Sequence, residues 1–267
     1  MIVKYALRLS GRMMWLRSTG YGVGGPIVGE FSTTRRTIAA TALLILAFAA
    51  SSAAQKPDLN GVWQGPYVPD MSRTGRNQTG EPNLPFTPAG EQEWKSYDAA
   101  NGDYTGSCLP FGLSRSVNAP NPFQIVQGGD SVAFLFEVNN WFHVVPTDGR
   151  PMPKDPNPQW FGTSVGRWDG DTLVIETRGF NGWTRLDTIG HPHSDQLHLT
   201  QTFRRTDADH IAYTVTVDDP VIYSRPWKNE RVITRQKGGL IEYSCEENNK
   251  DLREGHIKGW VPPTAKH

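Results

Sequence analysis

A two-residue period of apolar and polar side chains from residue 123 onward limits the possible folds of this chain more than any other feature. The stretch LHLTQTFRR, residues 197–205, places Leu199 and Phe203 on one face of an extended strand and Thr200 on the other. The stretch IAYTVTVDD, residues 211–219, repeats this alternation. Successive side chains of a β-strand point to opposite faces, so the pattern predicts an antiparallel sheet with one buried and one solvated face.

Tight turns divide this region into about ten short strands, a number typical of an all-β barrel or sandwich. The dipeptide Asp169-Gly170 joins FGTSVGRW to DTLVIET and favours a type I′ hairpin, which needs positive φ at both central residues. At the end of the run, the turn Lys237-Gly238-Gly239 predicts a last hairpin that ends with a strand over residues 238–245. We therefore predict a single antiparallel meander barrel, with a β-sandwich as the alternative.

The segments on either side of the strands predict little regular structure. Residues 68–122 are rich in Pro, Gly and Asn and predict an irregular region with one helix, which Thr87 can cap and Pro88 can begin. Near the C-terminus, the stretch CEENNKDLREG, residues 245–255, predicts one short helix. The expected fold is mostly β, with an irregular N-terminal segment and a short C-terminal helix.

The first 54 residues have the pattern of a leader that is not part of the fold. Arg35 and Arg36 precede an apolar run of 14 residues, TIAATALLILAFAA, and Ser52 and Ala54 stand at the positions that a signal peptidase reads. This run is short for a transmembrane helix, which needs about 20 residues. An uncleaved N-terminal anchor is the alternative to a cleaved signal peptide. We predict a signal peptide, a periplasmic or secreted protein without stable membrane insertion after cleavage, and one β-rich domain over residues 55–267.

The charge of residues 55–267 argues against nucleic acid as a partner. The leader holds six basic residues and one acidic residue, which leaves 21 basic and 26 acidic residues and a net charge of −5. Nucleic-acid binding requires a clustered positive surface. The two cysteines, Cys108 and Cys245, are expected to form a disulfide, because exported proteins with two cysteines often pair them. Two free buried thiols are the alternative.

Several motifs resemble those of known exported proteins. The stretch NGVW around Trp63 resembles the Gly-x-Trp opening of lipocalins and their calycin relatives, and a meander with a late helix also fits that family. The stretches PDLNGVW, VGRWDGDTLVIET and GHPHSD together resemble a large group of mostly uncharacterised exported bacterial β-rich proteins. This resemblance implies export and a β-rich fold, and it implies no particular activity.

The segment RGFNGWTRLDTIGHPHSDQ, residues 178–196, is the first candidate site, and we call it the rim loop. Its 19 residues exceed the usual length of a loop between strands, and long loops in compact domains are often functional. Asp187, His191 and His193 are the candidate catalytic residues. A histidine exchanges protons near neutral pH and an aspartate can orient its ring, so Asp187 with His191 is the preferred pair.

The same histidines could instead share a metal ion. In an extended segment, His191, His193 and Asp195 would point to the same side, and a carboxylate or a third histidine can complete a metal site. His143 and Glu137 are the candidates for a further ligand. We expect no metal and no other cofactor. The remaining interpretation is that the histidines bond the loop backbone and hold the loop closed.

A second set of polar residues would contact a ligand inside the barrel. Glu137 and His143 interrupt apolar strands, and polar groups that face an apolar cup need partners or form a ligand site. They could equally face outward, because the sequence does not fix the inner face. The predicted ligand-binding residues are Glu137, Trp141, His143, Arg178, Trp183 and Arg185.

These features together predict an exported barrel protein that binds a small apolar or aromatic molecule and could act on it through the rim loop. An acid/base or metal-dependent enzyme, such as a hydrolase, lyase or isomerase, is one alternative. An interaction module of the cell envelope is the other, and a filled barrel with an exposed apolar patch would favour it.

Overall fold

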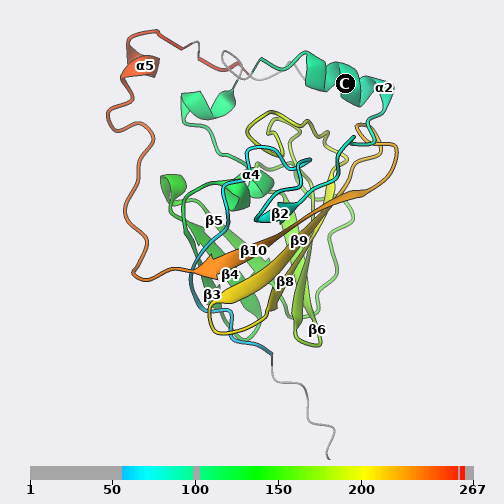
Figure 1. The fold of residues 1–267 in the computed structure, drawn as a ribbon, viewed down its shortest axis with the longest axis vertical. Coiled ribbons are helices and arrows are strands. Elements are labelled where there is room, and N and C mark those ends of the chain that lie inside the picture. Colours follow the sequence, from blue (N-terminus) through cyan, green and yellow to red (C-terminus); the bar gives the residue numbers. More distant parts are fainter. Residues whose placement is uncertain (1–55, 99–102, 258, 262–267) are drawn as a thin grey trace, which may run out of the picture. The chain divides into compact units, whose positions relative to one another are not determined.

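The computed structural model describes residues 56–98, 103–257 and 259–261, so the predicted leader lies outside the described residues. All described residues belong to one unit of the chain, Ala53–His267. The structure is mostly β, as predicted. Its strands wrap into a barrel, and α2 and α4 lie toward the upper end in the view of Figure 1.

Nine strands form the barrel, and each pairs with its neighbours in antiparallel fashion. Their order around the barrel is β5 (Phe142–Pro146), β4 (Ser131–Phe136), β3 (Phe123–Gln127), β1 (Gly61–Gln64), β10 (Trp227–Arg235), β9 (His210–Asp218), β8 (His198–Arg205), β7 (Thr172–Arg178) and β6 (Thr163–Asp169). Two meanders, β3 to β5 and β6 to β10, are thus joined by β1. The short strand β2 (Gln78–Thr79) pairs with β10 only. The predicted antiparallel barrel is confirmed.

The barrel is nearly closed, and its opening lies between the two end strands, β5 and β6. Within the described residues these strands contact each other without pairing their backbones. A Cβ added at Gly166 of β6 would lie 2.9 Å from Val145 Cγ1 of β5, so the two strands approach closely there. We call this line of contact the seam. It is held by side chains, because no β-ladder crosses it.

The interior of the barrel is filled by a hydrophobic core. The inward residues of β9 are buried as predicted: Ile211, Tyr213, Val215 and Val217. Aromatic rings fill the space between the walls, and the ring centroids of Phe134 and Phe203 lie 5.2 Å apart. Core side chains therefore occupy the space along the barrel axis where the sequence placed a ligand cup.

The helix α2 (Pro88–Lys95) begins where the sequence predicts it. The Thr87 hydroxyl accepts a hydrogen bond from Gly90 N at 3.0 Å, and Pro88 stands in the first turn, where its missing N–H has no helical partner to lose. The same segment also holds η1 (Tyr104–Ser107) and α4 (Leu113–Asn118), although the sequence predicted one helix. All six residues of α4 are buried, and a helix buried on every side has no amphipathic period to reveal it.

The prediction of a last strand over residues 238–245 is wrong. The edge of β10 already pairs with β1, where Trp63 lies opposite Arg235, so no hairpin partner can add there. The chain after β10 instead runs outside the barrel as an extended segment, residues 239–257 and 259–261, which we call the C-terminal strap (Figure 1). The predicted C-terminal helix lies within it as α5 (Lys250–Arg253).

A disulfide between Cys108 and Cys245 anchors the C-terminal strap, as predicted. The two Cα atoms are 5.5 Å apart. Hydrogen bonds near the turn η2 (Val138–Asn140) add to this link, because Cys245 N donates to Asn139 Oδ1 at 2.7 Å and Ile241 N donates to Glu137 Oε2 at 3.1 Å. The strap is therefore held by one covalent bond and by polar side chains.

Candidate functional site

A pocket of about 560 Å³ opens over the seam, and we call it the seam pocket. Its walls come from β5, from β6 and from the segment that leads into β6. Trp141, Trp160 and Phe161 give it aromatic walls, and the lining side chains of Phe142 and Val144 are 65% and 50% exposed. Both the volume and the mostly apolar lining are typical of small-molecule pockets.

Two polar side chains meet at the base of this pocket, one from each strand of the seam. His143 Nε2 of β5 and Ser164 Oγ of β6 share a hydrogen bond of 2.6 Å, and Ser164 Oγ shares another of 2.6 Å with Thr177 Oγ1 of β7. Burial lowers the pKa of His143 to about 4, because a charged imidazole loses its hydration there. His143 is therefore neutral at pH 7, and it bridges strands that no backbone bond joins.

Trp141 supplies the one buried side-chain donor in the lining that has no hydrogen-bond partner in the described structure. Its indole Nε1 is buried and has no hydrogen-bond partner among the described residues. Its ring lies 6.2 Å from that of Phe161, which in turn stacks on His143 at 6.0 Å. A buried N–H without an acceptor costs free energy, so an acceptor atom on a bound molecule would stabilise this arrangement.

In the rim loop, the structure brings together Asp187 and His191, the preferred acid/base pair. His191 Nδ1 and Asp187 Oδ2 are 2.6 Å apart, and both side chains are buried. The Asp187 carboxylate also accepts hydrogen bonds from the backbone N–H groups of Met71, Gly190 and His191, at 2.8, 3.2 and 3.1 Å. This carboxylate therefore organises the backbone of the loop and ties it to the segment before β2.

His193 lies in a different environment from His191. Its Nε2 shares a hydrogen bond of 2.6 Å with Thr184 Oγ1, and its ring packs edge-on against Phe180. Burial lowers the pKa of His193 to about 4. Asp195 is exposed while both histidines are buried, so the expectation that the three side chains share one side of an extended segment is wrong. The chain turns at Asp195, which ends the alternation.

Of the described residues, the group able to hold a metal ion is Asp70, Asp187 and His191, whose ligand atoms all lie within 4.8 Å of one another. His193, His143 and Glu137, which the sequence offered as metal ligands, are not members of this group. Asp70 already accepts hydrogen bonds from Ser72 N and Ser72 Oγ, at 2.9 and 2.6 Å. Both carboxylates of this group therefore already accept hydrogen bonds from donors of the protein itself.

Of the six predicted ligand-binding residues, Trp141 and His143 line the seam pocket and the other four do not. Glu137 accepts a hydrogen bond from the C-terminal strap. Arg185 pairs with Glu93 at 2.7 Å, Arg178 is exposed near His198, and Trp183 packs on Trp160 and Trp260.

Sequence reasoning missed the partners of Trp141 and His143. Phe161, Ser164 and Thr177 lie on or beside strands that follow later in the chain, and only closure of the barrel brings them to β5. The alternation of β6 and β7 could have identified Ser164 and Thr177 as inward-facing residues. Ser164 and Thr177 occupy buried positions where an apolar residue is normally expected.

The two buried histidines predict a loss of stability in mild acid. The folded pKa of about 4 lies below the ordinary value of 6.5, so the unfolded chain takes up protons first as the pH falls. The free energy of unfolding should therefore decrease between pH 6.5 and pH 4, by about 1.4 kcal/mol per pH unit for each histidine.

Urea denaturation of wild type and His143→Gln across this range measures the effect. The variant should show a shallower pH dependence, and His256→Gln, which changes an exposed imidazole, should not. Equal slopes in wild type and His143→Gln would contradict the burial of a neutral His143.

No family model matches this chain, and no curated protein is significantly similar to it. In the described residues, no helix combines the length and the apolar character needed to cross a membrane. The fold and the site define the class of the protein: a nearly closed antiparallel β-barrel with a filled interior and an aromatic pocket over its seam.

Proposed function

We propose that this protein binds a small apolar or aromatic molecule in the seam pocket and that the molecule carries a hydrogen-bond acceptor. The observation that carries the proposal is the buried, unpaired Nε1 of Trp141 in an aromatic lining. Aromatic walls favour a flat apolar body, and one unpaired donor favours a carbonyl or ether oxygen placed against it. The neutral His143, which also lines the pocket, adds no charge, which suits an uncharged ligand.

Hydrolysis is the second candidate function, because a serine hydroxyl and a histidine nitrogen lie 2.6 Å apart at the base of the pocket. A serine nucleophile needs a base whose pKa lies near the working pH and whose ring a third group orients. Burial lowers the pKa of His143 to about 4, and within the described residues its ring hydrogen-bonds to Ser164 alone. We therefore favour binding over catalysis.

We further propose that the protein works outside the cytoplasm. Two features support export: the leader pattern before residue 55 and the Cys108–Cys245 disulfide, since disulfides persist in oxidising compartments. Sequencing of the mature N-terminus tests this proposal, and a functional protein that begins at Met1 in the cytoplasm would contradict it.

A neutral fluorescent ketone, 6-propionyl-2-(dimethylamino)naphthalene, can test the binding proposal. Its emission should rise and shift to the blue on saturable binding, because the pocket replaces water around an aromatic ketone. Trp141→Phe keeps the aromatic wall and removes the N–H, so affinity should fall about fivefold, the value of one hydrogen bond near 1 kcal/mol. The same proteins should show no Ser164-dependent hydrolysis of 4-nitrophenyl acetate.

Trp168→Phe is the matched control, since Trp168 packs against the core and does not line the seam pocket. It should bind the ketone as wild type does. If wild type gives no saturable signal, or if Trp141→Phe and Trp168→Phe bind equally well, the seam pocket is not the binding site. Ester hydrolysis that Ser164→Ala abolishes would favour the second function.

A further inference from the structure

A buried arginine stands on the opposite part of the barrel, far along the sheet from the seam. Arg231 occupies an inward position of β10 and is 4% exposed. Its Nη1 donates to Asn118 Oδ1, but Nε and Nη2 are buried and have no partner in the described structure. The guanidinium carbon lies 4.9 Å from the centroid of the Tyr213 ring. None of these contacts brings a negative charge to the guanidinium.

Such an arrangement is costly unless something completes it. The Asp187 carboxylate acts on Arg231 electrostatically but forms no ion pair with it in the described structure. A buried charge without a direct ion pair, and buried donors without acceptors, each lower the stability of the folded state. The aromatic contact with Tyr213 returns only part of this cost. An apolar residue of similar size would fill the position without the penalty, so Arg231 indicates a role in binding an additional group.

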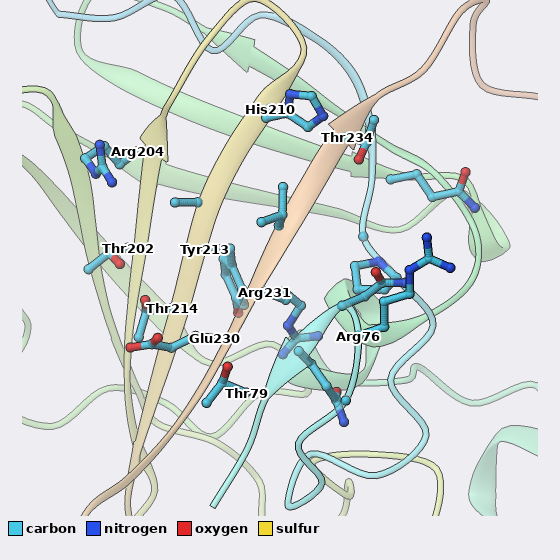
Figure 2. Close-up of a pocket in the computed structure, with 18 of the residues that line it drawn as sticks. Arg76, Thr79, Thr202, Arg204, His210, Tyr213, Thr214, Glu230, Arg231 and Thr234 are labelled. Atoms are coloured by element: carbon cyan, nitrogen blue, oxygen red, sulfur yellow. The ribbon is translucent and has the colours of Figure 1, made fainter.

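Arg231 and Tyr213 line a groove of about 1030 Å³ between strands β8 to β10 and the segment around β2. Figure 2 shows Arg204 on one side of these strands, Arg76 on the other, and Tyr213 next to Arg231 between them. Glu230 is the one carboxylate in the lining, against three arginines. The groove therefore favours an anion.

The two free nitrogens specify the kind of anion. Nε and Nη2 form one edge of the guanidinium, with parallel N–H bonds that match the two oxygens of a carboxylate. We propose that the groove binds a molecule with a carboxylate group and that this group accepts both hydrogen bonds from Arg231. The buried ring of Tyr213 packs against this guanidinium and against Phe203, and so holds Arg231 in position. This site is separate from the seam pocket and takes a charged ligand.

The segment around β2 controls access to Arg231. Gln78 of β2 lies opposite Arg231 in the sheet, and β2 pairs with no strand other than β10 in the described structure. The Gln78 side-chain oxygen is itself buried without a partner. Gln78 Nε2 also donates to the backbone oxygens of Asp70 and Arg73, at 2.9 and 3.0 Å. A shift of β2 together with the segment before it would open the guanidinium edge to the groove.

Sodium benzoate is the probe, titrated by calorimetry at constant ionic strength against sodium chloride. Wild type should bind benzoate saturably and should bind benzamide, its uncharged analogue, at least about tenfold more weakly. Arg231→Met should weaken benzoate binding by a similar factor. Arg225→Gln changes an arginine outside the groove that pairs with Glu81, and it should bind benzoate as wild type does.

A second measurement uses wild type alone, in case Arg231→Met fails to fold. With ¹⁵N-labelled arginine, the Nε–H signal that is absent from Arg231→Lys should shift as benzoate is added. No shift, or equal binding of benzoate by wild type and a folded Arg231→Met, would overturn the proposal. Inorganic phosphate that moves the same signal at lower concentration than benzoate would replace a carboxylate by a phosphate as the ligand group.

Discussion

Replacing Asp187 by alanine is expected to lower the free energy of unfolding by about 4–5 kcal/mol, because it leaves four buried donors without an acceptor. The backbone N–H groups of Met71, Gly190 and His191 lose a charged acceptor at once, and so does His191 Nδ1. Chemical denaturation monitored by tryptophan fluorescence measures the change.

Asp195→Ala is the matched control for this experiment, because Asp195 is an exposed aspartate of the same loop. Its effect should stay within about 0.5 kcal/mol, as for most surface substitutions. A similarly small effect of Asp187→Ala would mean that the carboxylate does not organise the rim loop. The case for an acid/base role of Asp187 and His191 would then become stronger.

Loss of the disulfide is the second change with a large expected effect. The bond links residues 137 positions apart, and the chain-entropy model gives it about 5 kcal/mol of stabilisation. The double variant Cys108→Ser with Cys245→Ser should therefore unfold at much lower urea concentration than wild type. Amide hydrogen exchange should also accelerate at Ile241 and Cys245, whose N–H groups bond side chains rather than a β-ladder.

Reductant provides the control for the disulfide experiment. Dithiothreitol should bring wild type to the stability of the double variant and should leave the double variant unchanged. A wild-type urea midpoint that does not move under fully reducing conditions would show that the C-terminal strap is held without the covalent link.

The barrel could be predicted from sequence because the alternation of apolar and polar residues within a strand shows which of its side chains share a face. The alternation in β9, for example, placed Val215 and Val217 inside without knowledge of any neighbour. The segment around Ile241 also alternates, yet it forms no strand. A strand could form there only if the edge of β10 were free. That edge pairs with β1, which comes from the start of the domain.

The candidate sites could also be predicted only where the signal lies within one strand, and not where it depends on a distant one. Trp141 and His143 stood out locally, because polar and aromatic groups interrupt an apolar run. Their partner Ser164 and the unpaired state of the Trp141 indole depend on how the two end strands meet. Arg231 looked like an ordinary polar residue in KNERVITR. Arg231 is buried because alternate residues of β10 share one face. Trp227 and Ile233 point inward, so Arg231 does too.

The position of β1 has a consequence for the kinetics of folding. Trp63 pairs with Arg235 on one side and with Phe123 on the other, so the docking of β1 joins residues near the two ends of the domain. The loop entropy of such a contact must be lost before its pairing energy is gained, which slows folding. Until β1 docks, the meanders β3 to β5 and β6 to β10 each keep an open edge. The interval before β1 docks is therefore the one in which the chain is most exposed to strand-to-strand aggregation.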